Sequence, residues 1–258
     1  MNKTRNAHTL IEVLVAVAVF SIITTLLALI FVEGLSVLRR TSGRDSAARE
    51  MRRARTVIVR DLATTRPSLL TLQDMPDNLG GGGKDGQAFW FLSPVDPTTG
   101  QIARTADGLP LWQVNILYYL VVPQNHDVTF GIHCNGAIGP GSYDDCCAHK
   151  VLIRKVIRTS ATPPEALLTS VAPYLTRPDG LQVDNMAAEP NLLEVKLAAT
   201  SLLYLRAQLA PNSIPNLVDA DLRAVDIQTA RKKSSLGAIS LYQAAPTLTL
   251  PFSVLLKN

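Results

Sequence analysis

Three cysteines and two histidines are concentrated in one short segment. The chain's only cysteines are Cys134, Cys146 and Cys147, and His133 and His149 lie at the ends of the segment. In an oxidising compartment Cys134 can pair with either of the other two, and closing a loop of about a dozen residues contributes up to about 3 kcal/mol in the chain-entropy account. Three thiolates and the His149 imidazole also make up a Cys₃His zinc set, but the side chains of adjacent cysteines diverge from a single metal. We expect a structural disulfide and no metal, with the pairing left open.

No other residue pattern predicts catalysis. The chain lacks the Gly-x-Ser-x-Gly and His-Glu-x-x-His motifs. Gly80, Gly81, Gly82 and Gly83 followed by Lys84 resemble a phosphate-binding loop, but Asp85 stands where that loop needs Ser or Thr. We expect a flexible loop there, no enzymatic activity and no cofactor.

A single carboxylate, Glu12, stands at the head of a long apolar run. Residues 13–32 are 20 consecutive residues without a charge. As a helix they span about 30 Å, the thickness of a bilayer's hydrocarbon core, and they exceed the roughly 7–15 apolar residues of a secretory signal. A carboxylate inside a membrane costs about 2.5–3.5 kcal/mol on insertion scales, so Glu12 is expected to have a partner. Of all residues, 47% are apolar and only 18% are charged, and the net charge is +4. This composition is consistent with a membrane-spanning helix joined to a domain with an apolar core.

A cut near the start of the chain would supply that partner. Residues 1–7 form a short leader with two basic residues, Lys3 and Arg5. Cleavage after Ala7 makes His8 the new terminus, with an α-amino group of pKa about 7.7–8.0 that is mostly protonated at neutral pH. We expect Glu12 to pair with such an amine on a neighbouring copy or relative, because each charge is costly alone. The alternative is a carboxylate that lies at the level of the lipid headgroups.

Residues 7–16, Ala-His-Thr-Leu-Ile-Glu-Val-Leu-Val-Ala, resemble the cleavage-and-methylation signature of type IV prepilins and type II secretion pseudopilins. The family usually has Gly before the cut, where this chain has Ala7, and Phe or Met after it, where this chain has His8. The resemblance implies cleavage between Ala7 and His8 by a prepilin peptidase and N-methylation of His8. It assigns subunit registry to Glu12. It also implies a single-pass inner-membrane protein whose C-terminal domain is periplasmic, and partners that are other pilins or pseudopilins and an inner-membrane assembly platform.

A second, amphipathic helix segment follows the apolar run. Buried-type residues recur on one helical face, and Pro67 is expected to end the helix; the face consists of Ala47, Met51, Ala54, Ile58 and Leu62. Residues 39–66 hold nine arginines and three acidic residues, a net charge of +6. We interpret most of these arginines as a solvated face. Attraction of Arg39, Arg40 and Arg44 to anionic headgroups is a second interpretation, and without interleaved aromatic residues we expect no nucleic-acid binding.

Beyond Pro67 the pattern predicts an antiparallel sheet packed on the helix, an α+β fold. Strands are expected at residues 87–92, 111–122, 128–132, 151–158, 201–208, 222–229 and 247–256, and Pro251 restricts the last of these to an edge or a bend. Helical turns are expected at residues 165–171 and 187–199. The predicted organisation is therefore a leader at 1–7, a long helix at 8–66 that spans the membrane at 13–32, and a periplasmic, β-rich, pilin-like domain at 67–258.

The order of elements is similar to the J-class minor pseudopilin and the W-class minor pilin, which have a long helix ending near an Arg-Asp-Leu segment, here residues 60–62. The interpretation is a minor structural subunit at or near a filament tip. The alternatives are an uncleaved, membrane-anchored periplasmic binding module, with or without a metal, and a protein whose main domain faces the cytoplasm. The first alternative predicts an intact Met1, and the second predicts three reduced cysteines.

Overall fold

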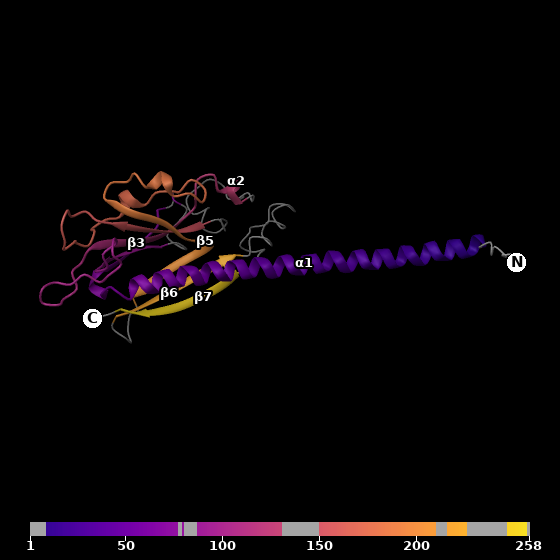
Figure 1. The fold of residues 1–258 in the computed structure, drawn as a ribbon, viewed down its shortest axis with the longest axis horizontal. Helices are drawn as coiled ribbons and strands as arrows, with labels where there is room; N and C mark the ends of the chain where they lie inside the picture. Colours follow the sequence, from indigo (N-terminus) through magenta and orange to yellow (C-terminus); the bar gives the residue numbers. More distant parts are fainter. Residues whose placement is uncertain are drawn as a thin grey trace, which may run out of the picture. The chain divides into compact units, whose positions relative to one another are not determined.

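The computed structural model describes residues 9–76, 79, 87–130, 150–209, 216–225 and 247–256. The chain divides into two compact units, Met1–Ser42 and Gly43–Asn258. Helix α1, Leu10–Leu62, contributes its first part to one unit and its second part to the other (Figure 1). The boundary between the units lies inside the helix, because the part of α1 from Gly43 onward packs on the sheet.

The first part of α1 is apolar on all sides. Its large side chains are exposed, for example Leu10 at 80%, Phe20 at 71% and Val32 at 64%. By length and composition this helix is able to cross a membrane. The hydroxyls of Ser21, Thr24 and Thr25 each donate a 2.8 Å hydrogen bond to the carbonyl four residues earlier. These polar groups are therefore satisfied within the helix, as a lipid environment requires.

The second unit is built on a seven-stranded antiparallel meander. The strands follow one another in space as they do in sequence, and each pairs with the next. They are β1 (Leu70–Asp74), β2 (Gln87–Ser93), β3 (Val114–Val121), β4 (Lys150–Ile157), β5 (Leu192–Leu209), β6 (Leu217–Val225) and β7 (Thr247–Leu255). The predicted α+β fold, a long N-terminal helix packed on an antiparallel sheet, is confirmed.

Strand β5 joins the two halves of this sheet. It is 18 residues long. Its residues up to Leu202 pair with β4, and its residues from Leu202 onward pair with β6. Register shifts flank this changeover, and Ser201 has a φ of 58°, a left-handed conformation that is unusual within a strand. The local irregularity lets one strand turn from one half of the curled sheet into the other.

The apolar helical face predicted in the second part of α1, which we call the buried stripe, packs against one face of the sheet. Ala54, Ile58 and Leu62 are fully buried, and Ala47 and Met51 are at most 4% exposed. Their core partners include residues of β2, β3, β5, β6 and β7, and Figure 1 shows β6 and β7 alongside this part of the helix. Complete burial of a side chain such as Ile58 or Leu62 contributes about 1.5–3 kcal/mol. The helical spacing of the stripe therefore positions the helix on the sheet.

The other face of the sheet is covered by the long connection between β4 and β5. Trp90, Tyr119 and Ile153 pack there with Tyr174 and Met186 of the connection. The connection contains only two short 3₁₀ turns, η3 (Ala172–Tyr174) and η4 (Asp184–Met186). Strand β3 is consequently buried along its whole length and reads as a nearly continuous apolar run, whereas β4 carries three charged residues although it is buried at every position except Arg154.

Three sequence-based expectations were wrong. Residues 126–130, which overlap the strand expected at 128–132, form a short helix, α2 (His126–Phe130). Residues 165–171 form neither helix nor strand, and most of 187–199 lies in β5. The last segment is rich in Ala, Leu and Glu, which favour a helix, but pairing with β4 outweighs that weak propensity. Strand β1 was not expected. The edge position of Pro251 is confirmed, because it lies in β7 at one edge of the described sheet and pairs with Asp221 of β6.

Candidate functional site

The N-terminus of α1 is closed by two reciprocal hydrogen bonds. The Thr9 N–H donates to Glu12 Oε2 at 2.9 Å, and the Glu12 N–H donates to Thr9 Oγ1 at 3.4 Å. This arrangement is a capping box, in which the N-cap residue and the third helical residue satisfy each other's backbone donors. The Glu12 carboxylate is thereby held in the first turn, where the helix dipole also favours a negative charge.

A shallow apolar hollow begins at this carboxylate. It is lined by Glu12, Val13, Ala16, Val17 and Phe20, whose spacing places them on one face of the helix. The lining is apolar except at the Glu12 end. A surface of this kind suits an apolar helix that carries a cation close to its own end.

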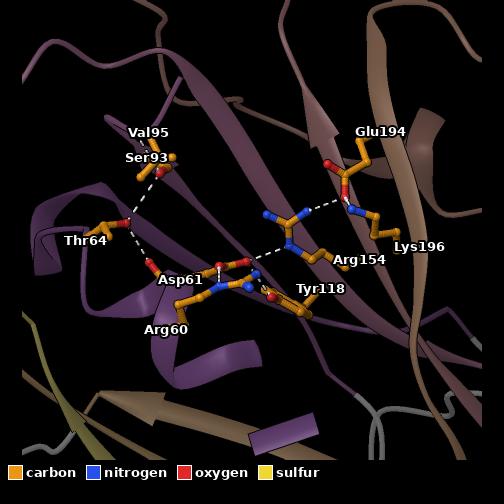
Figure 2. A network of polar contacts seen from close by, with 9 residues as sticks. All are labelled: Arg60, Asp61, Thr64, Ser93, Val95, Tyr118, Arg154, Glu194 and Lys196. Carbon is orange, nitrogen blue, oxygen red and sulfur yellow. Dashed lines mark hydrogen bonds and ion pairs between the residues drawn. The ribbon is translucent and has the colours of Figure 1, made fainter. Parts of the chain in front are cut away.

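A buried polar network lies at the other end of α1, inside the second unit (Figure 2). Asp61 is 6% exposed, and its Oδ2 accepts hydrogen bonds from the Tyr118 hydroxyl at 2.7 Å and from Arg154 Nε at 2.6 Å. Its Oδ1 accepts from Arg60 Nε at 2.9 Å. Arg154 also donates from its NH1 group to Glu194 Oε1 at 3.0 Å. The network therefore joins α1, β3, β4 and β5 through one carboxylate and one guanidinium.

The same network borders a cavity of about 450 Å³. Its wall includes Asp61, Ser93, Asp96, Arg154 and Glu194. Thr64 Oγ1 donates to the Asp61 carbonyl at 2.7 Å and lies 3.3 Å from Ser93 Oγ. The charged groups at its wall are largely paired with opposite charges, so the geometry supports positioning of the helix end on the sheet.

The electrostatics of the network keep Arg154 charged and Tyr118 protonated. Burial raises the pKa of the Tyr118 hydroxyl well above its ordinary value of 10.0, and the Asp61 charge raises it further. Burial acts to lower the pKa of Arg154, but the charge of Asp61 and its other partners outweigh burial, so the pKa is raised overall. Arg154 is thus held in its charged form beside the Asp61 carboxylate.

A second buried ion pair lies on the opposite face of β4. The Lys155 side chain is fully buried, and its Nζ lies 2.6 Å from Glu189 Oε2. Nζ also donates to the Tyr174 carbonyl at 2.7 Å and to Thr176 Oγ1 at 2.9 Å, and it lies 5.5 Å from the centre of the Tyr119 ring. Burial lowers the pKa of Lys155, although the hydrogen bond with Glu189 opposes the shift. This pair fastens the connection between β4 and β5 to the sheet.

Comparison with known protein families gives one match. Residues 2–28 match the family model of the prokaryotic N-terminal methylation motif. The chain carries a prepilin-type N-terminus. No curated protein and no solved structure matches the chain. The match supports membership of the type IV prepilin and pseudopilin family, and with the apolar helix it describes a membrane-anchored, pilin-like protein.

The prepilin-type N-terminus contains the three residues predicted to act in processing and assembly. Glu12 is the third residue of α1 and part of the capping box. Ala7 and His8 lie outside the described residues. Thr9 was missed as the N-cap, although Thr-x-x-Glu ahead of an apolar run is a recognisable capping signal. The other predicted site, Cys134, Cys146 and Cys147, also lies outside the described residues, so neither the disulfide nor the zinc interpretation is tested.

Proposed function

We propose that this chain is a minor structural subunit of a type II secretion pseudopilus or a type IV pilus. A prepilin peptidase cuts it after Ala7 and methylates the new amino group of His8. The sheet unit lies in the periplasm, and the apolar part of α1 is held in the inner membrane until the subunit joins a filament at or near its tip. Its contribution is assembly and not catalysis.

The observation that carries the proposal is the capped start of α1 inside the methylation motif. Both capping partners, Thr9 and Glu12, follow the Ala7–His8 bond. Cleavage there removes the basic leader and leaves the helix cap complete. The mature chain therefore begins one residue before the N-cap Thr9 and two before the first residue of α1, with its new amino group close to the membrane-embedded end.

Glu12 then acts as the group that sets subunit registry. A carboxylate offers about four acceptor sites, so the capping bond is compatible with an added cationic partner. The hollow from Glu12 to Phe20 receives the apolar helix of a neighbouring subunit, whose terminal amine reaches the carboxylate. Pairing these two charges offsets the cost of holding each in a low-dielectric environment.

Processing is tested on the full chain expressed with and without a prepilin peptidase. Protein extracted from the membrane is analysed by N-terminal sequencing and intact-mass measurement. With the peptidase we expect a chain that begins at His8 and is heavier by one methyl group. A chain that retains Met1 under both conditions would instead support an uncleaved membrane anchor.

The role of Glu12 is tested with three variants that separate its charge from its capping bond. Glu12→Ala removes the charge and the bond that its side chain accepts from the Thr9 N–H. Glu12→Gln removes the charge and keeps a side chain that can accept that bond. Thr9→Ala removes the hydroxyl that accepts from the Glu12 N–H and keeps the charge. We expect all three to insert in the membrane. Both Glu12 variants should be strongly depleted from sheared filaments, and Thr9→Ala should be retained. Normal incorporation of Glu12→Gln would contradict the proposed registry role.

A further inference from the structure

The second part of α1 presents a dense row of exposed arginines away from its buried stripe. Between Gly43 and Leu62 the helix buries one face against the sheet. Six arginines of this segment are exposed. Arg60 is paired with Asp61, and we call the other five the arginine face: Arg44, Arg49, Arg52, Arg53 and Arg55. These five occupy 12 residues of helix, so successive arginines are at most about 7.5 Å apart along the helix axis, close to the roughly 8 Å over which salt screens charges at physiological ionic strength.

No carboxylate neutralises the arginine face within the described part of the chain. None of its five arginines forms an ion pair there, and the two that donate hydrogen bonds reach carbonyl oxygens: Arg49 Nε to Asp45 O at 3.3 Å, and Arg53 NH2 to Leu197 O at 3.3 Å. Glu50 on the same helix instead accepts a 2.8 Å hydrogen bond from the Thr200 N–H. Residues 44–55 also include Asp45 and Glu50, which form no ion pair with these arginines in the described residues, and the stretch keeps a net charge of +3.

Uncompensated charge on this helix restricts which subunit can lie beside it. Under the proposed function, the apolar part of α1 brings subunits side by side. A second copy of this chain, offset by the four residues that separate His8 from Glu12, would still overlap most of the 12-residue arginine face, and like charges at short range are destabilising. A neighbour with carboxylates at this level would meet planar guanidinium groups that bind carboxylates through two donors.

We propose that the arginine face binds acidic side chains of a non-identical neighbouring subunit and disfavours a second copy of this chain at that position. The inference rests on the proposed function and adds the chemistry of the partner to it. A nucleic-acid strand is a poorer fit, because residues 43–62 include no aromatic side chain on which bases could stack. A lipid surface is a poorer fit as well, because a headgroup layer crossed by a helix meets only one end of such a row.

The test uses a charge-reversed copy of the full chain as the acidic neighbour. In Arg49→Glu/Arg52→Glu, two exposed arginines become glutamates, which have a similar helix propensity. The matched control, Arg104→Glu/Arg206→Glu, makes the same charge change at two exposed positions of the sheet unit. Wild-type and variant chains with donor or acceptor dyes at their C-termini are placed in uncharged phosphatidylcholine vesicles, and energy transfer measures pairing.

We expect pairs of wild-type and reversed chains to exceed like pairs by about threefold at low ionic strength, the scale of two exposed ion pairs. The excess should disappear at high salt, and the control should show no excess. Pairing that is measurable but equal in all combinations would overturn the inference and leave the proposed assembly through α1 standing. No pairing in any combination would contradict the assembly and the inference with it. Selective binding of a short DNA duplex, or of phosphatidylserine vesicles, by the wild-type but not the reversed chain would reassign the face to that ligand.

Discussion

Two adjacent residues of β4 carry buried positive charges on opposite faces of the sheet. Arg154 lies on the helix side, where Nε reaches Asp61 at 2.6 Å and NH1 reaches Glu194 at 3.0 Å. Lys155 lies on the other side, where Nζ reaches Glu189 at 2.6 Å. The partners differ in kind: Asp61 belongs to α1, 93 residues away in sequence, whereas Glu189 belongs to the irregular connection 34 residues away.

The two pairs also respond differently to burial. The pKa of Arg154 is raised, because its negative partners outweigh burial, and the pKa of Lys155 is lowered, because burial outweighs Glu189. A lysine that loses its partner can release its proton, whereas an arginine cannot. The helix therefore depends on a charge that is permanent, and the connection depends on a charge that can be neutralised.

Loss of Asp61 should have the largest effect. Asp61→Ala leaves the buried guanidinium of Arg154 without its main partner and the Tyr118 hydroxyl without its acceptor. Breaking a buried pair in this way costs about 3–5 kcal/mol. Denaturant unfolding of the full chain in detergent, followed by tryptophan fluorescence, measures it, since both tryptophans, Trp90 and Trp112, lie in the sheet unit.

Arg60→Ala is the matched control for that measurement. Arg60 binds the same Asp61 carboxylate, but its side chain is 66% exposed. Exposed ion pairs contribute at most about 1 kcal/mol. Equal losses for Asp61→Ala and Arg60→Ala would show that the buried pair does not hold the helix end.

Loss of Glu189 should be less severe and should depend on pH. Glu189→Ala leaves the Lys155 ammonium buried, but deprotonation limits the cost to about 2–3 kcal/mol at neutral pH. Without Glu189 the pKa of Lys155 in the folded chain lies further below its value of 10.5 in the unfolded chain. The stability of the Glu189→Ala variant therefore rises as the pH approaches 10.5. Unfolding curves from neutral to alkaline pH should show the Glu189→Ala deficit shrinking while the Asp61→Ala deficit does not. A deficit that stays constant with pH would remove the distinction between the two pairs.

Arg154→Lys tests whether the helix side needs a forked donor. Arg154 uses separate nitrogens for Asp61 and Glu194, and a lysine has only one nitrogen with which to replace them. We expect a loss of about 1–2 kcal/mol, the value of one charged hydrogen bond. Lys196→Ala serves as the control, because Lys196 binds the same Glu194 oxygen with a side chain that is 67% exposed. If Arg154→Lys is as stable as the wild type, a point charge suffices at this position.

The comparison also shows what the sequence could predict. The apolar stripe of α1 was predictable because burial follows the helical period, and the edge position of β7 was predictable because proline lacks an N–H. Asp61 has the spacing of the buried stripe, but its partner lies 93 residues away, and long-range pairing is not visible in local sequence. The strand at 192–199 was missed for the same reason, since its pairing with β4 decides its structure. At the N-terminus the Thr-x-x-Glu pattern is local, so the helix cap formed by Thr9 and Glu12 could have been predicted.

The smallest predicted effect is on the pH dependence of stability in the alkaline range, where Tyr118 and Lys155 act in opposite directions. The pKa of Tyr118 in the folded chain is raised above its ordinary value of 10.0, so Tyr118 loses its proton at lower pH in the unfolded chain than in the folded chain. The protonated hydroxyl therefore contributes fully to stability below pH 10, and the contribution is lost as the pH rises above 10. Half a pH unit above that value, the loss is about 0.8 kcal/mol. Lys155 acts in the opposite direction, because its lowered pKa makes stability rise as the unfolded chain approaches 10.5. Tyr118→Phe should therefore flatten the fall of unfolding free energy with pH, and Lys155→Met should steepen it. Parallel slopes in both variants would mean that neither Tyr118 nor Lys155 controls the response to alkaline pH.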